Sequence, residues 1–218
     1  MHLSLLTFDL GGTLIQPSPT VGESYAAVLQ AHGFAADADR INAAFPAALQ
    51  QWTHDADPRH SPRDERAIWQ RVARAALAEE SLPDAAFDAV FSDLFEAYAT
   101  GERWALLPDA LPVLRNLHRR GFRMAVISNS DSRMRRVLAD LGLDHFFEAL
   151  FLSGEIGFEK PDPKLFAHVA RVFELPPERI LHVGDSVRHD AQGAEASGWR
   201  HLLIKPGERT LATLPAVL

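Results

Sequence analysis

The chain begins with a short apolar run that ends at an acidic residue and a glycine turn. Residues 3–8 are mostly apolar without a helical period, and Asp9 is followed closely by Gly11 and Gly12. Such a run predicts a buried β-strand with an exposed carboxyl end. Asp9 then lies where open parallel sheets place their sites. On this stretch alone, a carboxylate there is a nucleophile or metal ligand, or it caps a turn or helix.

The second half of the chain alternates between helical and strand patterns. From Pro108 onward, short apolar runs at 124–127, 150–152, 180–183 and 202–204 are separated by segments with helical spacing. Strands that alternate with helices favour a parallel sheet covered on both faces. We therefore expect an α/β fold with a three-layer core of about five parallel strands.

A helical segment interrupts this pattern after the first strand. Strand signals are absent from about residue 20 to 100, and Thr20 with Glu23 forms a capping box at the start of a helix. A second helix is expected over 37–52, where Pro46 should kink or break it. A polar loop is expected at 54–62, and two further helices follow it.

The change of pattern divides the chain into two predicted domains. Residues 1–16 and 105–218 are expected to form the α/β core, and residues 17–104 are expected to form an α-helical insertion.

Composition narrows the class of protein. The 218 residues include no cysteine, which excludes disulfides and thiolate chemistry. No apolar stretch reaches the roughly 18 residues of a membrane span, and Asp9 interrupts the segment where a signal peptide would lie, so we expect a cytoplasmic protein without a membrane partner. The formal net charge of −7 disfavours nucleic acid as a partner.

Polar side chains gather where the predicted strands end. Asp9, Ser128 with Asn129, and Asp185 follow three strands, and Lys160 comes shortly after a fourth. Because parallel strands end at one edge of a sheet, these residues can converge. Two carboxylates, hydroxyl and amide donors and one ammonium suit a phosphate ester held against Mg²⁺. A carboxylate can attack phosphorus to form an acyl phosphate that water later cleaves.

Four segments occur in the order and spacing of a known superfamily. They are Phe8-Asp9-Leu10-Gly11-Gly12-Thr13-Leu14, then Ser128-Asn129, then Lys160-Pro161-Asp162-Pro163, and finally Gly184-Asp185 with Asp190 five residues further on. Through these motifs the chain resembles the haloacid dehalogenase (HAD)-like hydrolases over nearly its whole length. The resemblance implies a Rossmann-like core, with the helical insertion as a cap that closes over the site and binds the rest of the substrate.

The resemblance also implies a role for each motif residue. Asp9 is expected to be the nucleophile, and Lys160 to neutralise the transferring group. Ser128, Asn129, Gly12 and Lys160 are expected to bind the substrate phosphate. The expected Mg²⁺ ligands are Asp9, the backbone carbonyl of Gly11, Asp185, and Asp190 directly or through water. The implied function is hydrolysis of a small phosphorylated metabolite through an aspartyl-phosphate.

One position departs from the family pattern. Phosphatases of the superfamily have a second aspartate two residues after the first, as general acid and base, where this chain has Gly11. Glycine keeps the carbonyl expected to bind the metal, but it offers no proton. A positioned acid is worth 10²–10⁴ in rate, or about 3–5 kcal/mol of barrier. Alkyl phosphates should therefore suffer more than aryl or acyl phosphates, unless a neighbour such as His189 supplies the proton.

Two alternatives remain open from the sequence. The chain could be a catalytically feeble phosphometabolite sensor, which Gly11 favours. It could also be a metal-independent 2-haloacid dehalogenase, although the pair Asp185 and Asp190 resembles a metal site. Phosphonate cleavage through a cap lysine is disfavoured because residues 17–104 contain no lysine.

Overall fold

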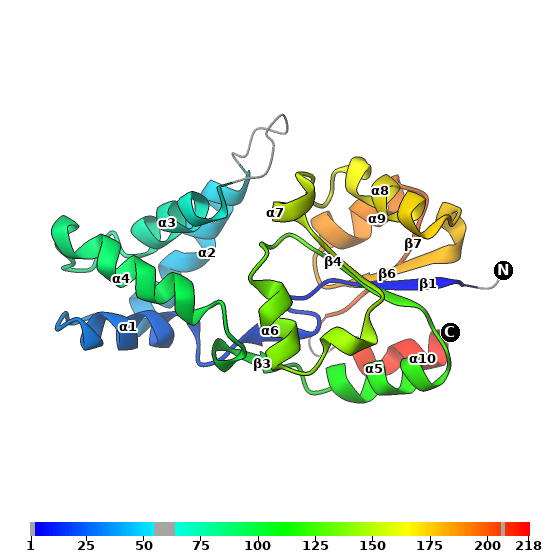
Figure 1. Ribbon diagram of the computed structural model, residues 1–218, viewed down its shortest axis with the longest axis horizontal. Coiled ribbons are helices and arrows are strands. Elements are labelled where there is room, and N and C mark those ends of the chain that lie inside the picture. The colour runs from blue at the N-terminus through cyan, green and yellow to red at the C-terminus, as the bar shows by residue number, and fades with distance from the viewer. Residues whose placement is uncertain (1–2, 55–63, 206–207) are drawn as a thin grey trace. The chain divides into compact units, whose positions relative to one another are not determined.

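The chain folds into two compact units joined by two connections. The computed structural model describes residues 3–54, 64–205 and 208–218 (Figure 1). One unit comprises residues 1–16 and 106–218, and the other comprises residues 17–105. The loop expected at 54–62 lies, except for His54, outside the described residues.

The first unit is built on a five-stranded parallel sheet. Its strands are β1 (Leu5–Phe8), β4 (Met124–Ser128), β5 (Ala149–Leu152), β6 (Ile180–Gly184) and β7 (Arg200–Leu203). Their order across the sheet is β5-β4-β1-β6-β7, and every pairing is parallel. The inner strands are mostly apolar because both faces of the sheet are covered, whereas the edge strand β7 begins with the exposed residues Arg200 and His201. The predicted α/β class with a parallel sheet is confirmed.

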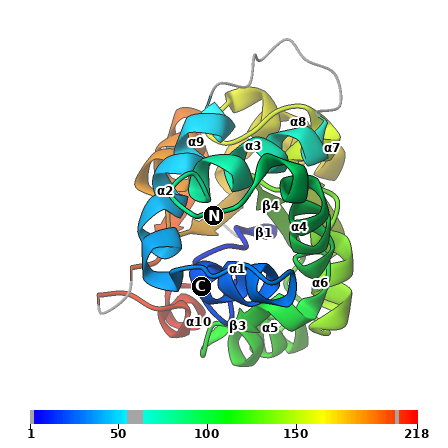
Figure 2. The ribbon, with the colours of Figure 1, turned by 90° about the vertical axis from the view of Figure 1, so that its left-hand side faces the viewer.

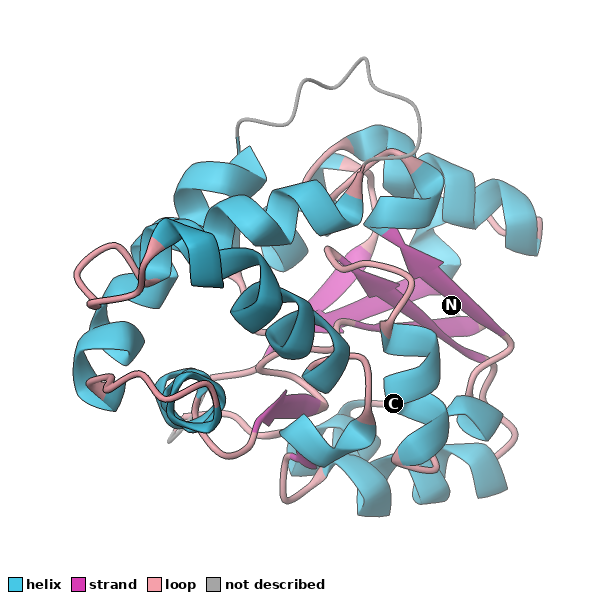
Figure 3. Cartoon of the chain, turned by 60° about the vertical axis from the view of Figure 1, so that its left-hand side comes forward, coloured by secondary structure: helices cyan, strands magenta, loops and turns pink. Residues whose placement is uncertain are grey.

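Helices cover both faces of this sheet. They are α5 (Ala110–Arg119), α6 (Met134–Asp140), α7 (Ser153–Ile156), α8 (Pro163–Phe173), α9 (Gly193–Ala196) and α10 (Leu214–Val217). Figure 2 shows α8 and α9 on one side of β1 and β4, with α5 and α10 on the other. Figure 3 shows the same arrangement, with the magenta strands between cyan helices.

The apolar core beneath α8 ties the central strands to the helix. Side chains from alternate positions of the strands pack against one face of α8 and against α9. They include Leu5, Ala125, Ile127, Ile180, Leu165, Phe166, Val169 and Ala194. All of these side chains are fully buried, which fixes where the start of α8 lies relative to the strand ends.

The strand order places β1 at the switch point of the sheet. From β1 the chain continues to β4 and β5 on one side, and it returns to β6 and β7 on the other. Side chains that follow β1 are therefore flanked by those that follow β4 and β6. Ligand sites in open parallel sheets lie at such a switch point, beyond the carboxyl ends of the strands.

The described part of the second unit is a bundle of four helices. They are α1 (Val21–Ala31), α2 (Ala38–His54), α3 (Glu65–Ala76) and α4 (Asp84–Ala97). Thr20 and Glu23 form the predicted capping box at the start of α1. Every helix contributes to one apolar core, which includes Tyr25, Leu29, Ile41, Val72, Val90 and Phe91.

Pro46 was expected to kink or break the second helix, and the predicted break was wrong because α2 continues through Pro46. A proline removes one backbone hydrogen bond from a helix interior. Packing of α2 against both α1 and α3 opposes the break.

Two short features were not predicted. Ile15–Pro17 (β2) and Trp104–Leu106 (β3) pair as a two-stranded sheet formed by the two connections between the units. In addition, Val187–Gln192 forms a π-helix ahead of α9, a type of helix that the helical spacing of the sequence does not indicate. Helices of π type are rare and often occur at functional sites.

A membrane-spanning helix is absent from the described part of the chain, since every helix there is too short or too polar.

The close contact between α1 and α2 generates a test of the helical unit. Gly22 donates its backbone N–H to Asn42 Oδ1 at 2.7 Å, and a Cβ at this position would collide with the carbonyl of Ala38. Helix propensity favours Gly22→Ala by about 1 kcal/mol. Overpacking costs about 1–3 kcal/mol, and the clashing atom belongs to the backbone of α2 and not to a flexible side chain, so the variant should be less stable. Urea unfolding measures the difference.

Gln30→Ala is the matched control, because Gln30 lies exposed on the same helix. Its effect should stay within about 0.5 kcal/mol of wild type. A Gly22→Ala protein more stable than wild type would contradict the close packing of α1 against α2.

Candidate active site

Asp9 lies at the centre of the carboxyl edge of the sheet. It directly follows β1, and its backbone N–H donates to the carbonyl of Val183 on β6 at 2.9 Å. This hydrogen bond continues the pairing of β1 with β6 by one residue, and it fixes Asp9 just beyond the end of β1. The Asp9 residue is 8% exposed, so its carboxylate needs a cationic partner.

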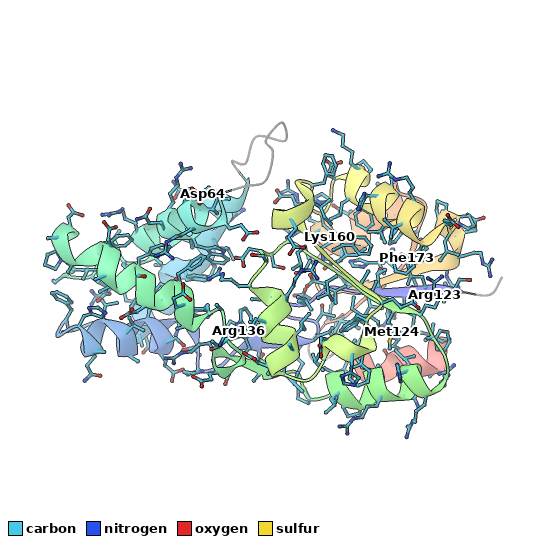
Figure 4. All side chains as sticks on the ribbon, viewed as in Figure 1. Asp64, Arg123, Met124, Arg136, Lys160 and Phe173 are labelled. Carbon is cyan, nitrogen blue, oxygen red and sulfur yellow. The ribbon has the colours of Figure 1, made fainter. Side chains whose placement is uncertain are left out.

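Lys160 is that partner. Its side chain is 2% exposed, and Nζ donates to Asp9 Oδ1 at 2.7 Å and to Asp190 Oδ1 at 2.5 Å. A buried ammonium between two carboxylates is a strong charge-assisted arrangement. In Figure 4, Lys160 lies toward the end of the sheet opposite to Arg123, which precedes β4.

The residues around Lys160 explain why it enters the site from the start of α8. Asp162 is the N-cap of this helix and accepts a hydrogen bond from the backbone N–H of Lys164 at 2.8 Å, while Pro163 occupies the first helical position. Proline is well suited to that position because its missing N–H has no helical partner there. The motif thus begins a helix and presents the lysine immediately before it.

Asn129 makes a contact that the sequence did not predict. Its side-chain Oδ1 accepts from the backbone N–H of Lys160 at 2.7 Å, and Nδ2 donates to the carbonyl of Lys160 at 2.8 Å. The side-chain amide of Asn129 therefore bonds both the backbone N–H and the backbone carbonyl of Lys160. It fixes the loop from which the ammonium extends, whereas the sequence predicts a contact with substrate phosphate.

Asp190 is held by three donors. Lys160 Nζ and His182 Nε2 both lie on Oδ1, and the backbone N–H of Ser186 donates to Oδ2 at 2.9 Å. The π-helix brings this carboxylate back over the end of β6. The position of Asp190 explains why residue 184 is a glycine, because a Cβ at Gly184 would collide with the Asp190 carboxyl group.

Asp185 completes an acidic group. Asp9, Asp185 and Asp190 each offer a carboxylate oxygen, and these atoms lie within 4.8 Å of one another. Gly12 packs against this group. Its φ is +77°, and a Cβ there would collide with the Asp185 carboxylate. Residues more than 170 positions apart are thus gathered at one point, as the common edge of parallel strands predicts.

The pKa values reflect burial and mutual charge. Burial raises the pKa of Asp9, although Lys160 opposes this. Burial acts to lower the pKa of Lys160, but the charges of Asp9 and Asp190 outweigh it and the pKa is raised. Burial also acts on Asp190, yet Lys160 and His182 hold the pKa of that carboxyl far below its usual range. Lys160 and Asp190 therefore form an ion pair at neutral pH.

The acidic group fits a divalent cation. Three carboxylates face one buried ammonium, which leaves two negative charges without a counter-charge inside the group. Burial and the charge of Asp190 raise the pKa of Asp185, so its ionised form gains from a nearby cation. Oxygen ligands of this kind are those that Mg²⁺ prefers.

The remaining predicted residues surround this cluster. Ser128 is the buried last residue of β4, next to Asn129. Gly11 lies in the exposed glycine turn, and nothing stands within 4 Å of where its Cβ would be. His189 is half-buried in the π-helix, where its backbone N–H donates to Ser186 Oγ at 3.1 Å. The roles expected for these three residues stay predictions.

Sequence reasoning missed two contacts near the cluster. His182 lies inside an apolar strand, and its hydrogen bond to Asp190 was not foreseen. Asp131 and Arg133, just after Asn129, form a largely buried ion pair at 2.6 Å. The sequence does hold a signal for His182, because a polar residue inside an apolar strand needs a partner. His182 stands two positions before Gly184, and Thr7 stands two positions before Asp9 in the first strand.

A parallel α/β core with a lysine and an acidic cluster at its carboxyl edge defines the general class of this protein. Comparison with known proteins gives the family: the model of the haloacid dehalogenase-like hydrolases matches residues 3–198. The chain therefore belongs to the haloacid dehalogenase-like hydrolase family.

Curated relatives support the assignment. The chain is 32% identical over 211 residues to the mouse (Mus musculus) haloacid dehalogenase-like hydrolase domain-containing protein 3, covering 95% of this chain and 84% of the relative. It is also 35% identical over 143 residues to a phosphoserine phosphatase of Thermus thermophilus, covering 64% of this chain and 55% of that protein.

Solved structures share the fold. The magnesium-bound HAD-hydrolase YfnB of Bacillus subtilis has a TM-score of 0.78 at 21% identity, covering 100% of this chain and 99% of that chain. An L-2-haloacid dehalogenase of Xanthobacter autotrophicus has a TM-score of 0.74 at 21% identity, covering 93% and 77%. Phosphatases and dehalogenases are thus both similar to this chain.

Removal of the buried ammonium tests the electrostatics of the cluster. In Lys160→Met, the carboxylates of Asp9 and Asp190 stay buried without their cation, which should cost about 3–5 kcal/mol of unfolding free energy. The cost should shrink at acidic pH, because protonation of the carboxylates removes the uncompensated charge. Urea unfolding with a metal chelator measures both effects.

Lys164→Met is the matched control, because Lys164 lies exposed four residues away. Its stability should stay within about 0.5 kcal/mol of wild type. Equal stability of the two variants at neutral pH would contradict the role of Lys160 as the counter-charge of the cluster.

Proposed function

We propose that this protein is a Mg²⁺-dependent phosphatase that hydrolyses a small phosphorylated molecule through an aspartyl-phosphate on Asp9. The observation that carries the proposal is the buried ammonium of Lys160, which bridges Asp9 and Asp190 within an acidic group suited to a divalent cation. Phosphatases among the relatives support the same reaction class.

Asp9 is the proposed nucleophile. One carboxylate oxygen attacks phosphorus, the bond from phosphorus to the ester oxygen breaks, and the alcohol leaves with a proton taken from solvent. Water then attacks the acyl phosphate, which releases inorganic phosphate and regenerates the carboxylate. Lys160 holds Asp9 in place and neutralises charge on the transferring group.

The metal site is proposed to consist of Asp9, Asp185, the carbonyl of Gly11, and Asp190 directly or through water. When bound, Mg²⁺ supplies positive charge to the phosphoryl oxygens and relieves repulsion among the carboxylates. Ser128, Asn129, the turn at Gly12 and Lys160 are proposed to contact the phosphoryl oxygens. The helical unit is proposed to act as the cap that recognises the rest of the substrate.

Turnover of an aryl phosphate tests the reaction and its nucleophile. Wild-type protein should hydrolyse 4-nitrophenyl phosphate with Mg²⁺ and lose activity in chelator. Asp9→Asn should lower kcat by at least 10³-fold, because an amide cannot form the acyl phosphate. Absorbance of released nitrophenolate measures the rate.

Asp144→Asn is the control, since Asp144 is exposed and lies outside the acidic group. It should retain wild-type kcat. Absence of turnover in wild type, or equal activity of Asp9→Asn, would refute the proposed reaction.

Gly11 generates a second test. Its backbone is outside the left-handed region and its Cβ position is open, so a side chain fits there without strain. Gly11→Asp should raise kcat/KM for an alkyl phosphate by about 10²-fold, because a carboxyl group can protonate the poor leaving group. The gain for 4-nitrophenyl phosphate should be smaller. Steady-state kinetics on both substrates measure the ratio.

Gly11→Asn is the matched control, because it has the same shape as aspartate without the acid. It should leave the alkyl phosphate rate near that of wild type. Equal rates for Gly11→Asp and wild type on the alkyl phosphate would show that another group already supplies the proton.

The open side of Gly11 also favours a second candidate function, a phosphometabolite sensor that keeps the site without efficient turnover. Calorimetry with a phosphorylated metabolite and a turnover assay separate the two functions. Tight binding without acyl-phosphate formation supports the sensor, whereas turnover supports the phosphatase. Halide release from a 2-haloacid in the presence of chelator would instead establish dehalogenation.

A further inference from the structure

A buried polar pair lies behind the acidic cluster. In the register of β1 and β6, Thr7 is directly paired with His182, and both residues are fully buried. Thr7 Oγ1 lies 2.9 Å from His182 Nδ1, and His182 Nε2 lies 2.9 Å from Asp190 Oδ1. A chain of hydrogen bonds therefore runs from the middle of the sheet to the carboxylate that binds Lys160.

The ionised carboxylate of Asp190 determines which groups donate and which accept along this series of hydrogen bonds. Asp190 is ionised and can only accept, so His182 Nε2 carries a proton and donates to it. Thr7 Oγ1 lies on the other ring nitrogen, Nδ1, which is an acceptor when Nε2 carries the proton of the ring. Thr7 then donates its hydroxyl proton to Nδ1, and the two hydrogen bonds fix the ring orientation.

The contact on Asp190 is shared with the catalytic lysine. His182 Nε2 and Lys160 Nζ both donate to Oδ1, while the backbone N–H of Ser186 occupies Oδ2. Because Asp190 is anchored on both oxygens, its rotation about the carboxyl group is fixed. Lys160 bonds this fixed oxygen with one donor and Asp9 Oδ1 with another.

Stability alone does not account for the pair. A threonine and a histidine in the interior of two central strands give up hydration that apolar side chains of the same shape would not need. Replacement of both partners of a buried hydrogen bond by apolar groups is often neutral or stabilising. The rings of Phe166 and His182 pack in a T-shaped arrangement with their centroids 5.9 Å apart, so the site accommodates apolar neighbours.

We propose that Thr7 and His182 are positioning residues that orient Asp190 and, through it, hold the Lys160 ammonium against Asp9. Both are buried beneath the cluster, so they act through Asp190 and not by touching substrate. The inference rests on the proposed function for its activity readout. The orientation of Asp190 within the acidic group is tested separately, by measuring Mg²⁺ affinity.

Thr7→Val is the central variant, because valine keeps the shape of threonine and removes the hydroxyl. With the ring no longer anchored at Nδ1, kcat for 4-nitrophenyl phosphate should fall about 10-fold or more, with KM nearly unchanged. Mg²⁺ affinity, measured by calorimetry with the metal alone, should weaken by about 10-fold, the low end of the 10–100-fold cost of losing a direct partner of a metal ligand, because Thr7 acts on Asp190 through His182. Thr7→Ser restores the hydroxyl and should restore both values.

Ile180→Val is the stability control. Ile180 is fully buried in the core on β6 and its apolar side chain takes no part in the hydrogen-bond chain, so its truncation should lower the unfolding midpoint while kcat and Mg²⁺ affinity stay at wild-type values. His182→Gln provides a second variant if Thr7→Val is too mild, because its amide can still donate but has no ring to orient. It should show a larger loss of kcat than Thr7→Val.

The outcomes separate this inference from the proposed function. Loss of kcat and Mg²⁺ affinity in Thr7→Val, with recovery in Thr7→Ser, supports positioning. Wild-type kcat and Mg²⁺ affinity in Thr7→Val and His182→Gln, with only a lowered midpoint as in Ile180→Val, would overturn it. If wild type shows no turnover, the proposed function fails, and the Mg²⁺ measurements still decide the positioning role.

Discussion

The buried ion pair of Lys160 with Asp9 and Asp190 is the interaction on which the rest of the site depends. Isolated buried charges are costly, and an ammonium that is 2% exposed is tolerated only because two carboxylates surround it. The three side chains come from the end of β1, the start of α8 and the π-helix after β6. Further contacts hold each of these three elements in the position that brings the side chains together.

Several of those contacts explain residues that otherwise look incidental. Gly184 and Gly12 leave room for the carboxylates of Asp190 and Asp185. Asn129 holds the backbone of Lys160, and Asp162 caps the helix that begins just after it. These residues of the motifs thus meet steric and hydrogen-bonding requirements of one charged cluster.

The sequence predicted the parts that follow from periodicity and from the geometry of parallel sheets. Apolar runs without helical spacing identified the strands, and the shared edge of parallel strands explains why Asp9, Asp185 and Asp190 come together. Contacts that depend on tertiary placement were not predictable. The π-helix forms where Asp190 reaches the amide of Ser186, and its residues carry no distinctive pattern. Pro46 suggested a helix break that packing of α2 overrides.

The same distinction applies to the polar side chains. Local sequence does not show that the amide of Asn129 spans the backbone of a residue 31 positions away, or that strand register pairs Thr7 with His182. Such pairings depend on register between strands that are distant in sequence. Polar residues inside apolar strands are nevertheless a signal that can be read in advance, since each needs a partner.

The most direct test of the account is chemical trapping of the intermediate. Wild-type protein is mixed with 4-nitrophenyl phosphate and Mg²⁺, quenched in acid during turnover, reduced with borohydride and digested for peptide mass spectrometry. An acyl phosphate on Asp9 is reduced to an alcohol, so the account predicts homoserine at position 9. Homoserine at another aspartate, or turnover without any reduced aspartate, would contradict the claim that the buried cluster makes Asp9 the nucleophile.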